Sequence, residues 1–216
     1  MKRFPRLMFL LLCLLPPDAA AAASTPALLE GRDYELIANP APFAPLAGKI
    51  EVTEVFGYTC GHCAHFETVL RPWVAKLPAD VRFTPVPAAF GGTWDAFARA
   101  YYAADQLGVS RRSHGAMFEA LHDKRSLPMQ NVSPQELATF YSSYGVTPQR
   151  YIEALRSDKV DQQIKTAREF AIRSGVQGTP TLIVNGKYLV KGRNFEDVLR
   201  ITDALVARER SAGKQR

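Results

Sequence analysis

Residues 50–67 read Ile50-Glu-Val-Thr-Glu-Val-Phe-Gly-Tyr-Thr-Cys60-Gly-His-Cys63-Ala-His-Phe-Glu67. The first seven carry β-branched and aromatic side chains on both alternations, which is typical of a strand covered on both faces. The Cys60-Gly-His-Cys63 segment follows at once, and apolar residues then recur at helical spacing from Phe66 to Leu77. The two cysteines are therefore predicted to lie where a central strand ends and a helix begins, a position at which open α/β sheets place their sites.

The chain on either side of this segment predicts an α/β fold. Strands are expected at 33–37 and 81–86, and a hairpin at 181–190 whose Asn185-Gly186 pair suits a type I′ turn. Between them, residues 93–173 show helical patterns, and one of these opens with a capping box at Ser133-Pro-Gln-Glu136. Asn194 can cap a final helix.

Composition excludes several classes of protein. The chain has 216 residues, 47% of them hydrophobic and 22% charged, which is ordinary for a globular protein of one domain or one domain with an insertion. The net charge is +6, and without the first 23 residues it is +4, spread along the chain. Such a small surplus gives no footprint for nucleic acid, so no nucleic-acid partner is expected.

The N-terminal segment is predicted to be a secretory signal peptide. A basic start (Met1-Lys-Arg-Phe-Pro-Arg6) precedes nine apolar residues and a small-residue cleavage site ending at Ala23. Nine residues span less than half a bilayer, for which about 20 are needed, so a membrane anchor is not expected. We therefore predict export to the periplasm.

Export changes the meaning of the cysteines. Of the three, Cys13 would leave with the signal peptide, so Cys60 and Cys63 would stand alone in an oxidising compartment. A disulfide exchanges only when a thiolate attacks it. Cys60 lies where helix N–H groups favour negative charge, and His62 can add a positive or hydrogen-bonding neighbour. We therefore expect Cys60 to be the reactive thiolate and Cys63 to resolve the mixed disulfide, rather than a permanent local disulfide or half a zinc site.

Three stretches together resemble the DsbA family of secreted thiol:disulfide oxidoreductases: residues 54–67, Phe90-Gly91-Gly92, and Gly178-Thr-Pro180-Thr-Leu-Ile-Val-Asn-Gly-Lys-Tyr188. The resemblance covers essentially the whole chain after the signal peptide. It implies a thioredoxin fold with an inserted all-helical domain. The expected divisions are a signal peptide at 1–23, a first thioredoxin-like part at 24–92, the helical domain at 93–165 and a second thioredoxin-like part at 166–216.

The resemblance also assigns roles. It implies an oxidase that gives its disulfide to unfolded exported proteins with free thiols, works as a monomer without cofactors, and is reoxidised by a membrane quinone-linked partner of the DsbB type. It places a buried Glu near the inner cysteine, and Glu54 shares a strand face with Val52 and Phe56, so Glu54 is expected to shuttle the proton of Cys63. The alternative for Glu54 is a solvent-facing residue on an edge strand.

Other residues take lesser roles by the same resemblance. Thr179-Pro180 resembles the cis-proline loop that faces the cysteines, so we expect a cis bond here and, with Gly61, a surface that binds a substrate peptide by β-augmentation. Glu67 matches the family and is interpreted as a surface group that tunes reactivity. Pro85 or a neighbour stands where some members have Lys, which leaves a proton relay through that Lys in doubt. The remaining histidines are expected on helix surfaces or partly buried with partners: His65, His114 and His122.

Two alternatives stay open. Gly61 and Thr179 are more typical of the isomerase and reductase branches, so a disulfide isomerase or reductase is the second hypothesis, although residues 24–50 show no dimerisation segment. The third is a metal-binding thioredoxin-fold protein. Zinc would need two more ligands at suitable spacing, and haem attachment would need His where Ala64 stands, so no metal site is predicted.

Overall fold

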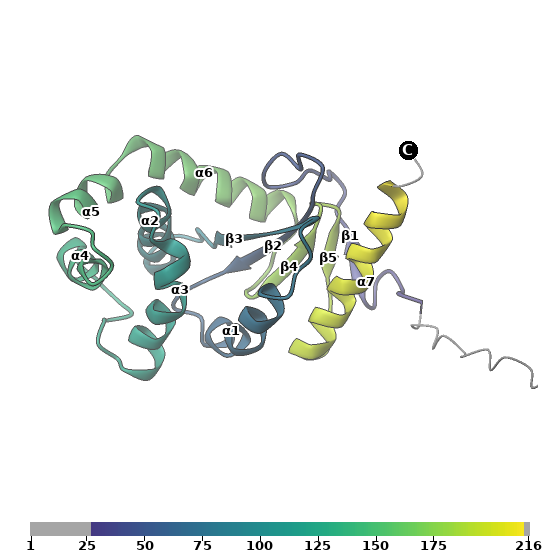
Figure 1. The fold of residues 1–216 in the computed structure, drawn as a ribbon, viewed down its shortest axis with the longest axis horizontal. Helices are drawn as coiled ribbons and strands as arrows, with labels where there is room; N and C mark the ends of the chain where they lie inside the picture. Colours follow the sequence, from purple (N-terminus) through teal and green to yellow (C-terminus); the bar gives the residue numbers. More distant parts are fainter. Residues whose placement is uncertain (1–26, 214–216) are drawn as a thin grey trace, which may run out of the picture.

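One mixed sheet runs through the centre of the fold. A computed structural model describes residues 27–213 of the chain. In this part of the chain five strands pair in the order β1-β5-β4-β2-β3 (Figure 1). The pair β2–β3 is parallel and the other three pairs are antiparallel. The strands are β1 (Tyr34–Leu36), β2 (Ile50–Phe56), β3 (Val81–Pro87), β4 (Thr181–Val184) and β5 (Tyr188–Val190). The predicted α/β class is confirmed.

Helices cover the sheet and extend beyond one end of it. Helices α1 and α7 pack against one another on the same side of the sheet, and α2 to α5 form a block beyond β2 and β3 from which α6 returns (Figure 1). The helices are α1 (Gly61–Val74), α2 (Thr93–Gln106), α3 (Ser110–Phe118), the π-helix η1 (Glu119–Asp123), α4 (Pro134–Ser142), α5 (Pro148–Leu155), α6 (Asp158–Arg173) and α7 (Phe195–Gly213). The helices therefore interrupt the sheet between β3 and β4, as predicted.

The central strand β2 is buried along its whole length, because β3 and β4 flank it and helices cover it. Its residues join two apolar clusters. Ile50 and Val52 pack with Phe66 of α1 and Ile201 of α7. Phe56 packs with the aromatic side chains of the helical block. The expectation of a strand covered on both faces is confirmed. Cys60 follows the buried end of this strand by four residues.

Local signals in the sequence decide where several elements begin. Ser133 and Glu136 form the predicted capping box at the start of α4, and Asn194 Oδ1 accepts the Asp197 N–H at the start of α7. Asn185 and Gly186 turn the hairpin with φ values of 51° and 62°. A left-handed backbone suits Gly186, where a Cβ would also lie 1.9 Å from the carbonyl oxygen of Ala41. The hairpin prediction is confirmed.

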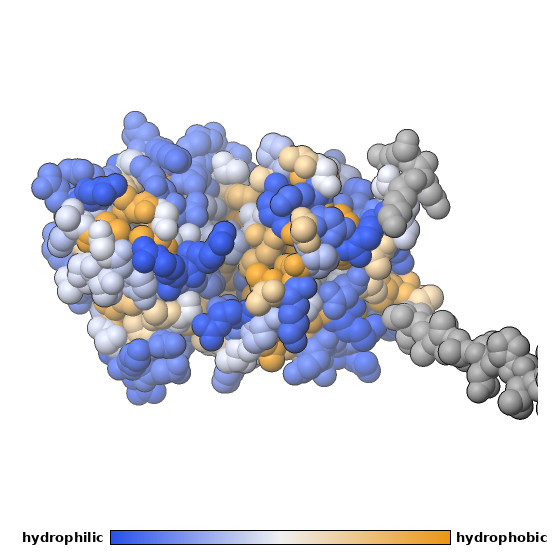
Figure 2. Space-filling view, viewed as in Figure 1, coloured by the Kyte–Doolittle hydropathy of each residue, from blue (hydrophilic) through white to orange (hydrophobic). Residues whose placement is uncertain are grey.

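The surface of the described residues is mixed in character. Figure 2 shows an apolar area near the middle of the viewed face, between largely hydrophilic ends. No helix within residues 27–213 has the length and apolar character to cross a membrane. The predicted signal peptide, residues 1–23, lies outside the described residues.

Candidate active site

The two cysteines occupy different environments at the start of α1. Cys60 is the N-cap of α1, and its sulfur accepts the Cys63 backbone N–H at 3.4 Å. Its own N–H donates to Gly57 O at 3.1 Å, which closes a turn between β2 and the helix. Cys60 is half-buried, whereas Cys63 is 1% exposed. The Cys63 sulfur accepts the Gly57 N–H at 3.5 Å, so Gly57 is hydrogen-bonded to both cysteines.

Gly57 leaves room for this turn. A Cβ on Gly57 would lie 2.1 Å from the indole ring of Trp94 on α2. Any larger residue would therefore have to displace Trp94 or the turn. The close approach joins the cysteine turn to the helical block.

The two thiols differ strongly in acidity. The pKa of Cys60 is lowered to about 5, chiefly because the Cys63 thiol donates a hydrogen bond to it. The Thr179 side chain and the backbone N–H groups of Cys63 and His62 lower it further, and burial opposes them. The pKa of Cys63 is raised, mainly by burial and then by its bond to Cys60, and the charge of Glu54 raises it further. The arrangement thus favours a thiolate at Cys60 and a protonated Cys63.

The loop before β4 faces Cys60. The Thr179–Pro180 peptide bond is cis, as predicted. The Cys60 sulfur lies 3.4 Å from the Thr179 carbonyl oxygen, to which its thiol form donates, across 119 residues of sequence. Two segments that are distant in the chain therefore meet at the reactive sulfur.

Glu54 lies inside the sheet, paired with Pro85 of β3 and Leu182 of β4. It is 2% exposed, so the prediction that it is buried is confirmed and the solvent-facing alternative is wrong. Burial, followed by the charges of Glu67 and Cys60, raises its pKa well above the usual range. Among the described residues its Oε2 has no hydrogen-bond partner. A carboxyl in this setting favours its protonated form.

Gly61 and His62 lie at the exposed first turn of α1. The group of His62 that lowers the pKa of Cys60 is its backbone N–H. A role for the imidazole stays a prediction. Within residues 27–213, no group of three or more His, Cys, Asp or Glu side chains is placed to hold a metal ion.

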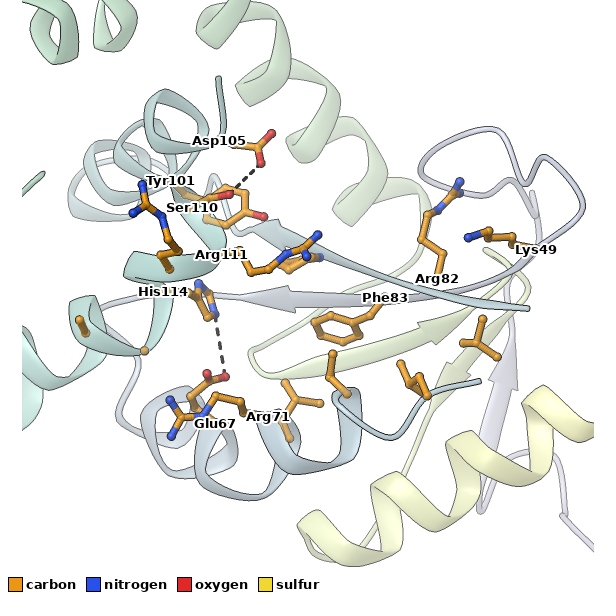
Figure 3. Close-up of a pocket in the computed structure, with 18 of the residues that line it drawn as sticks. Lys49, Glu67, Arg71, Arg82, Phe83, Tyr101, Asp105, Ser110, Arg111 and His114 are labelled. Atoms are coloured by element: carbon orange, nitrogen blue, oxygen red, sulfur yellow. Dashed lines mark hydrogen bonds and ion pairs between the residues drawn. The ribbon is translucent and has the colours of Figure 1, made fainter. Parts of the chain in front are cut away.

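Glu67 is less exposed than the interpretation as a surface group implies, while its tuning role stays a prediction. Its side chain is 15% exposed, and its Oε2 lies 3.9 Å from His114 Nε2. Burial raises its pKa to about 7. Both residues lie on the wall of a cavity of about 930 Å³ between α1, α3 and β3, to which Arg71 and Arg111 also contribute (Figure 3). Glu67 lies four residues after Cys63, and this helical spacing could have indicated an inward position.

Two histidines without a predicted role contact the turn before Cys60. His114 Nδ1 lies 2.9 Å from the hydroxyl oxygen of Tyr58, and His122 Nε2 lies 2.7 Å from the Tyr58 carbonyl oxygen. Both are partly buried with partners, as predicted, and His65 is exposed on α1. The spacing of His114, Phe118 and His122 by four residues indicated one helix face, although not what that face contacts.

Comparisons with known proteins agree with this arrangement. Residues 80–201 match the family described as the DSBA-like thioredoxin domain, and this segment begins after Cys63. The chain is 36% identical over 188 residues to the thiol:disulfide interchange protein DsbA of Pseudomonas aeruginosa, with 86% of this chain and 87% of that protein covered. It is 38% identical over 199 residues to the protein of the same name from Pseudomonas syringae pv. tomato, with 90% of each covered.

Solved structures show the same similarity. The crystal structure of the oxidoreductase DsbA from Xylella fastidiosa superimposes with a TM-score of 0.84 at 58% identity, covering 85% of this chain and 98% of that one. The crystal structure of Pseudomonas aeruginosa DsbA superimposes with a TM-score of 0.78 at 36% identity, covering 85% and 95%. The predicted thioredoxin fold with inserted helices is therefore confirmed.

Proposed function

Because the chain belongs to the DsbA family of thiol:disulfide oxidoreductases, we propose that it introduces disulfides into exported proteins through Cys60 and Cys63. The observation that carries this proposal is the asymmetry of the two thiols. The pKa of Cys60 is lowered to about 5, and that of the buried Cys63 is raised. A stable thiolate is a good leaving group, so a disulfide between these residues readily oxidises other thiols.

In the first step, a thiolate of the substrate attacks the Cys60 sulfur of the Cys60–Cys63 disulfide. The Cys60–Cys63 bond breaks, a mixed disulfide forms, and Cys63 leaves with an electron pair. Because the pKa of Cys63 is high, this leaving group needs a proton. Burial raises the pKa of Glu54 and so favours its protonated form, and in its ionised form Glu54 raises the pKa of Cys63, so the two groups are electrostatically coupled. We therefore assign the donation of this proton to Glu54.

In the second step, another thiolate of the substrate attacks the substrate sulfur of the mixed disulfide. The bond to Cys60 breaks, and Cys60 leaves as a thiolate that its hydrogen bonds stabilise. The substrate has then lost two electrons and two protons to form its disulfide. The protein holds the two electrons as a Cys60 thiolate and a Cys63 thiol, and Glu54 regains a proton from solvent.

The cis-proline loop is assigned to binding the substrate. The Thr179 backbone lies beside Cys60 at the start of β4, where an extended peptide could pair with it next to the reactive sulfur. Gly61 is exposed at the start of α1 and has open space around its Cα, so it leaves room for a substrate peptide beside Cys60. By the same assignment the protein acts in the periplasm on unfolded exported proteins, and a DsbB-type quinone-linked partner reoxidises it.

A redox titration of the purified protein against glutathione tests the proposal. An oxidase is expected to equilibrate between about −180 and −120 mV, the range of strongly oxidising thioredoxin-fold proteins. A value near −270 mV, as for thioredoxin, would contradict the oxidase assignment and favour a reductase. Gly61 and Thr179 keep an isomerase as the second candidate, and an assay of scrambled-disulfide rearrangement separates it from simple oxidation.

A further inference from the structure

Tyr58 is held at its hydroxyl and at its carbonyl oxygen by the helical block. It lies two residues before Cys60, and its side chain is 2% exposed. Its hydroxyl pairs with His114 of α3 at 2.9 Å, and its carbonyl oxygen pairs with His122 of η1 at 2.7 Å. Two histidines eight residues apart therefore converge on one residue of the cysteine turn.

The protons of this contact can be assigned from the groups present. A carbonyl oxygen only accepts hydrogen bonds, so His122 donates to it from Nε2. Glu67 faces the Nε2 of His114 at 3.9 Å, and a carboxylate favours an N–H on that side. His114 Nδ1 then accepts the Tyr58 hydroxyl proton, which satisfies the buried Tyr58 hydroxyl.

The rings around His114 leave it little freedom. Its imidazole lies 4.8 Å from the ring of Phe56 and 5.3 Å from that of Phe118, both in edge-to-face contact. His122 follows in η1, a π-helical turn. A π-helical turn contains one more residue than an α-helical turn and so shifts the side chains that follow it, and such turns occur frequently at functional sites. Here the shifted turn carries the side chain that reaches the Tyr58 carbonyl.

The residue held in this way lies inside the turn that positions both cysteines. Gly57, the first residue of the turn, accepts from the Cys60 N–H and donates to the Cys63 sulfur. A turn free to rotate at Tyr58 would move the Cys60 sulfur away from the helix N–H groups that stabilise its charge. We propose that His114 and His122 are positioning residues that fix this turn, and thereby hold Cys60 in the geometry at which α1 caps its sulfur.

The inference rests on the proposed role of Cys60 as the reactive thiolate, and the experiment measures that thiolate directly. Absorbance at 240 nm against pH gives the pKa of Cys60 in the reduced full-length protein and its variants. His122→Gln keeps an N–H near the position of Nε2, whereas the shorter His122→Asn does not reach the carbonyl. We expect the pKa to stay near the wild-type value in His122→Gln and to rise by about one unit, tenfold in the ionisation constant, in His122→Asn.

A double-mutant cycle tests the second contact. Tyr58→Phe and His114→Leu each remove one side of the hydroxyl bond, and His114→Asn keeps an acceptor near Nδ1. We expect both removals to raise the pKa of Cys60 and lower the equilibrium constant for oxidising glutathione, with little further change when they are combined. His65→Leu, on the exposed side of α1, is the control for loss of a histidine and should leave both quantities unchanged.

The outcomes separate this inference from the proposed function. If denaturant stability falls in His122→Asn, Tyr58→Phe and His114→Leu while the pKa of Cys60 and the glutathione equilibrium stay constant, the histidines are structural only and the inference is wrong. If Cys60 of the wild-type protein titrates near 8.5, as an ordinary thiol does, the proposed function loses its basis as well. If His114→Leu does not fold, the pair His122→Gln and His122→Asn still decides the question.

Discussion

Reduction of the Cys60–Cys63 disulfide should change the stability of the protein in a way that depends on pH. The pKa of Cys60 in the folded protein is about 5, and that of an unfolded cysteine is about 8.5. Because the folded pKa is depressed, the thiolate stabilises the reduced fold fully above about pH 8.5, and this contribution is lost as pH falls through about 5. The oxidised protein has no thiol to ionise at this position, so titrating groups that do not interact with the cysteines cancel in the comparison, and what is left is the Cys60 thiolate with its coupling to Glu54.

The size of the effect follows from the two pKa values. The ionisation of Cys60 contributes about 2.7 kcal/mol at pH 7 and about 0.4 kcal/mol at pH 5. Cys60 is only half-buried, so solvent screens part of this, and we expect the reduced form to gain about 1 kcal/mol on the oxidised form between pH 5 and pH 7. The disulfide closes a very short loop, so its own stabilisation of the folded state is small, and it does not depend on pH. A strong oxidant requires a stabilised reduced form, so the reduced form is expected to be the more stable one near neutral pH, and its lead should shrink as pH falls toward 5.

Urea unfolding of both redox forms at half-unit pH steps from 5 to 8 measures this gap. In the reduced state Cys60→Ser is the control: serine does not ionise, so its stability should follow the pH profile of the oxidised protein. A gap between the two forms that is constant over this range would refute the reasoning, because Cys60 would then not be an activated thiolate.

Three further predictions concern single residues. Cys63→Ala should accumulate mixed disulfides with exported proteins on non-reducing gels, because the resolving thiol is gone; trapping by Cys60→Ala instead would reverse the assignment. Glu54→Gln should slow dithiol oxidation near neutral pH by at least about tenfold with unchanged circular dichroism, since the proton donor is lost, and unchanged rates from pH 5 to 8 would remove Glu54 from the mechanism. Gly57→Ala should destabilise the fold by about 1–3 kcal/mol in urea, because its Cβ would overlap the ring of Trp94; an unchanged midpoint would show that this contact is easily relieved.

Local signals were enough to place the elements that carry the cysteines. The double alternation of residues 50–56 predicted a buried central strand, and the Asn185-Gly186 pair predicted the hairpin that β4 and β5 form. These features depend on neighbours in sequence, so their patterns are complete within a few residues. The cis bond at Thr179–Pro180 came from a family resemblance, and its contact with Cys60 spans 119 residues.

Long-range partners of polar residues could not be predicted in this way. Nothing in the sequence around Glu51 indicates that it is buried, yet it is fully buried in the structure. Its carboxylate accepts hydrogen bonds from Arg82 and Thr84 of β3 and from the Phe43 N–H. Glu67 was misplaced for the same reason, since the α3 residue that faces it is 47 positions away. A hydrophobic pattern reports which face turns inward, but the partner that makes burial of a charge tolerable depends on how separate elements pack.

The spacing of the two cysteines requires an acid near only one of them. Cys60 is the N-cap of α1, and Cys63 is the third helical residue, whose side chain points back toward the helix start. The same first turn therefore provides backbone N–H groups that stabilise a thiolate at Cys60. It also places the Cys63 side chain in the core, next to Gly57 at the end of β2. A sulfur that cannot hold charge must be protonated as it leaves, whereas Cys60 can leave without help. Glu54 is on the strand that ends at this turn, buried, and the carboxyl whose charge acts on Cys63. Burial raises the pKa of Glu54 and so favours the protonated form that the leaving Cys63 needs, and among the described residues its Oε2 has no hydrogen-bond partner that would hold the proton.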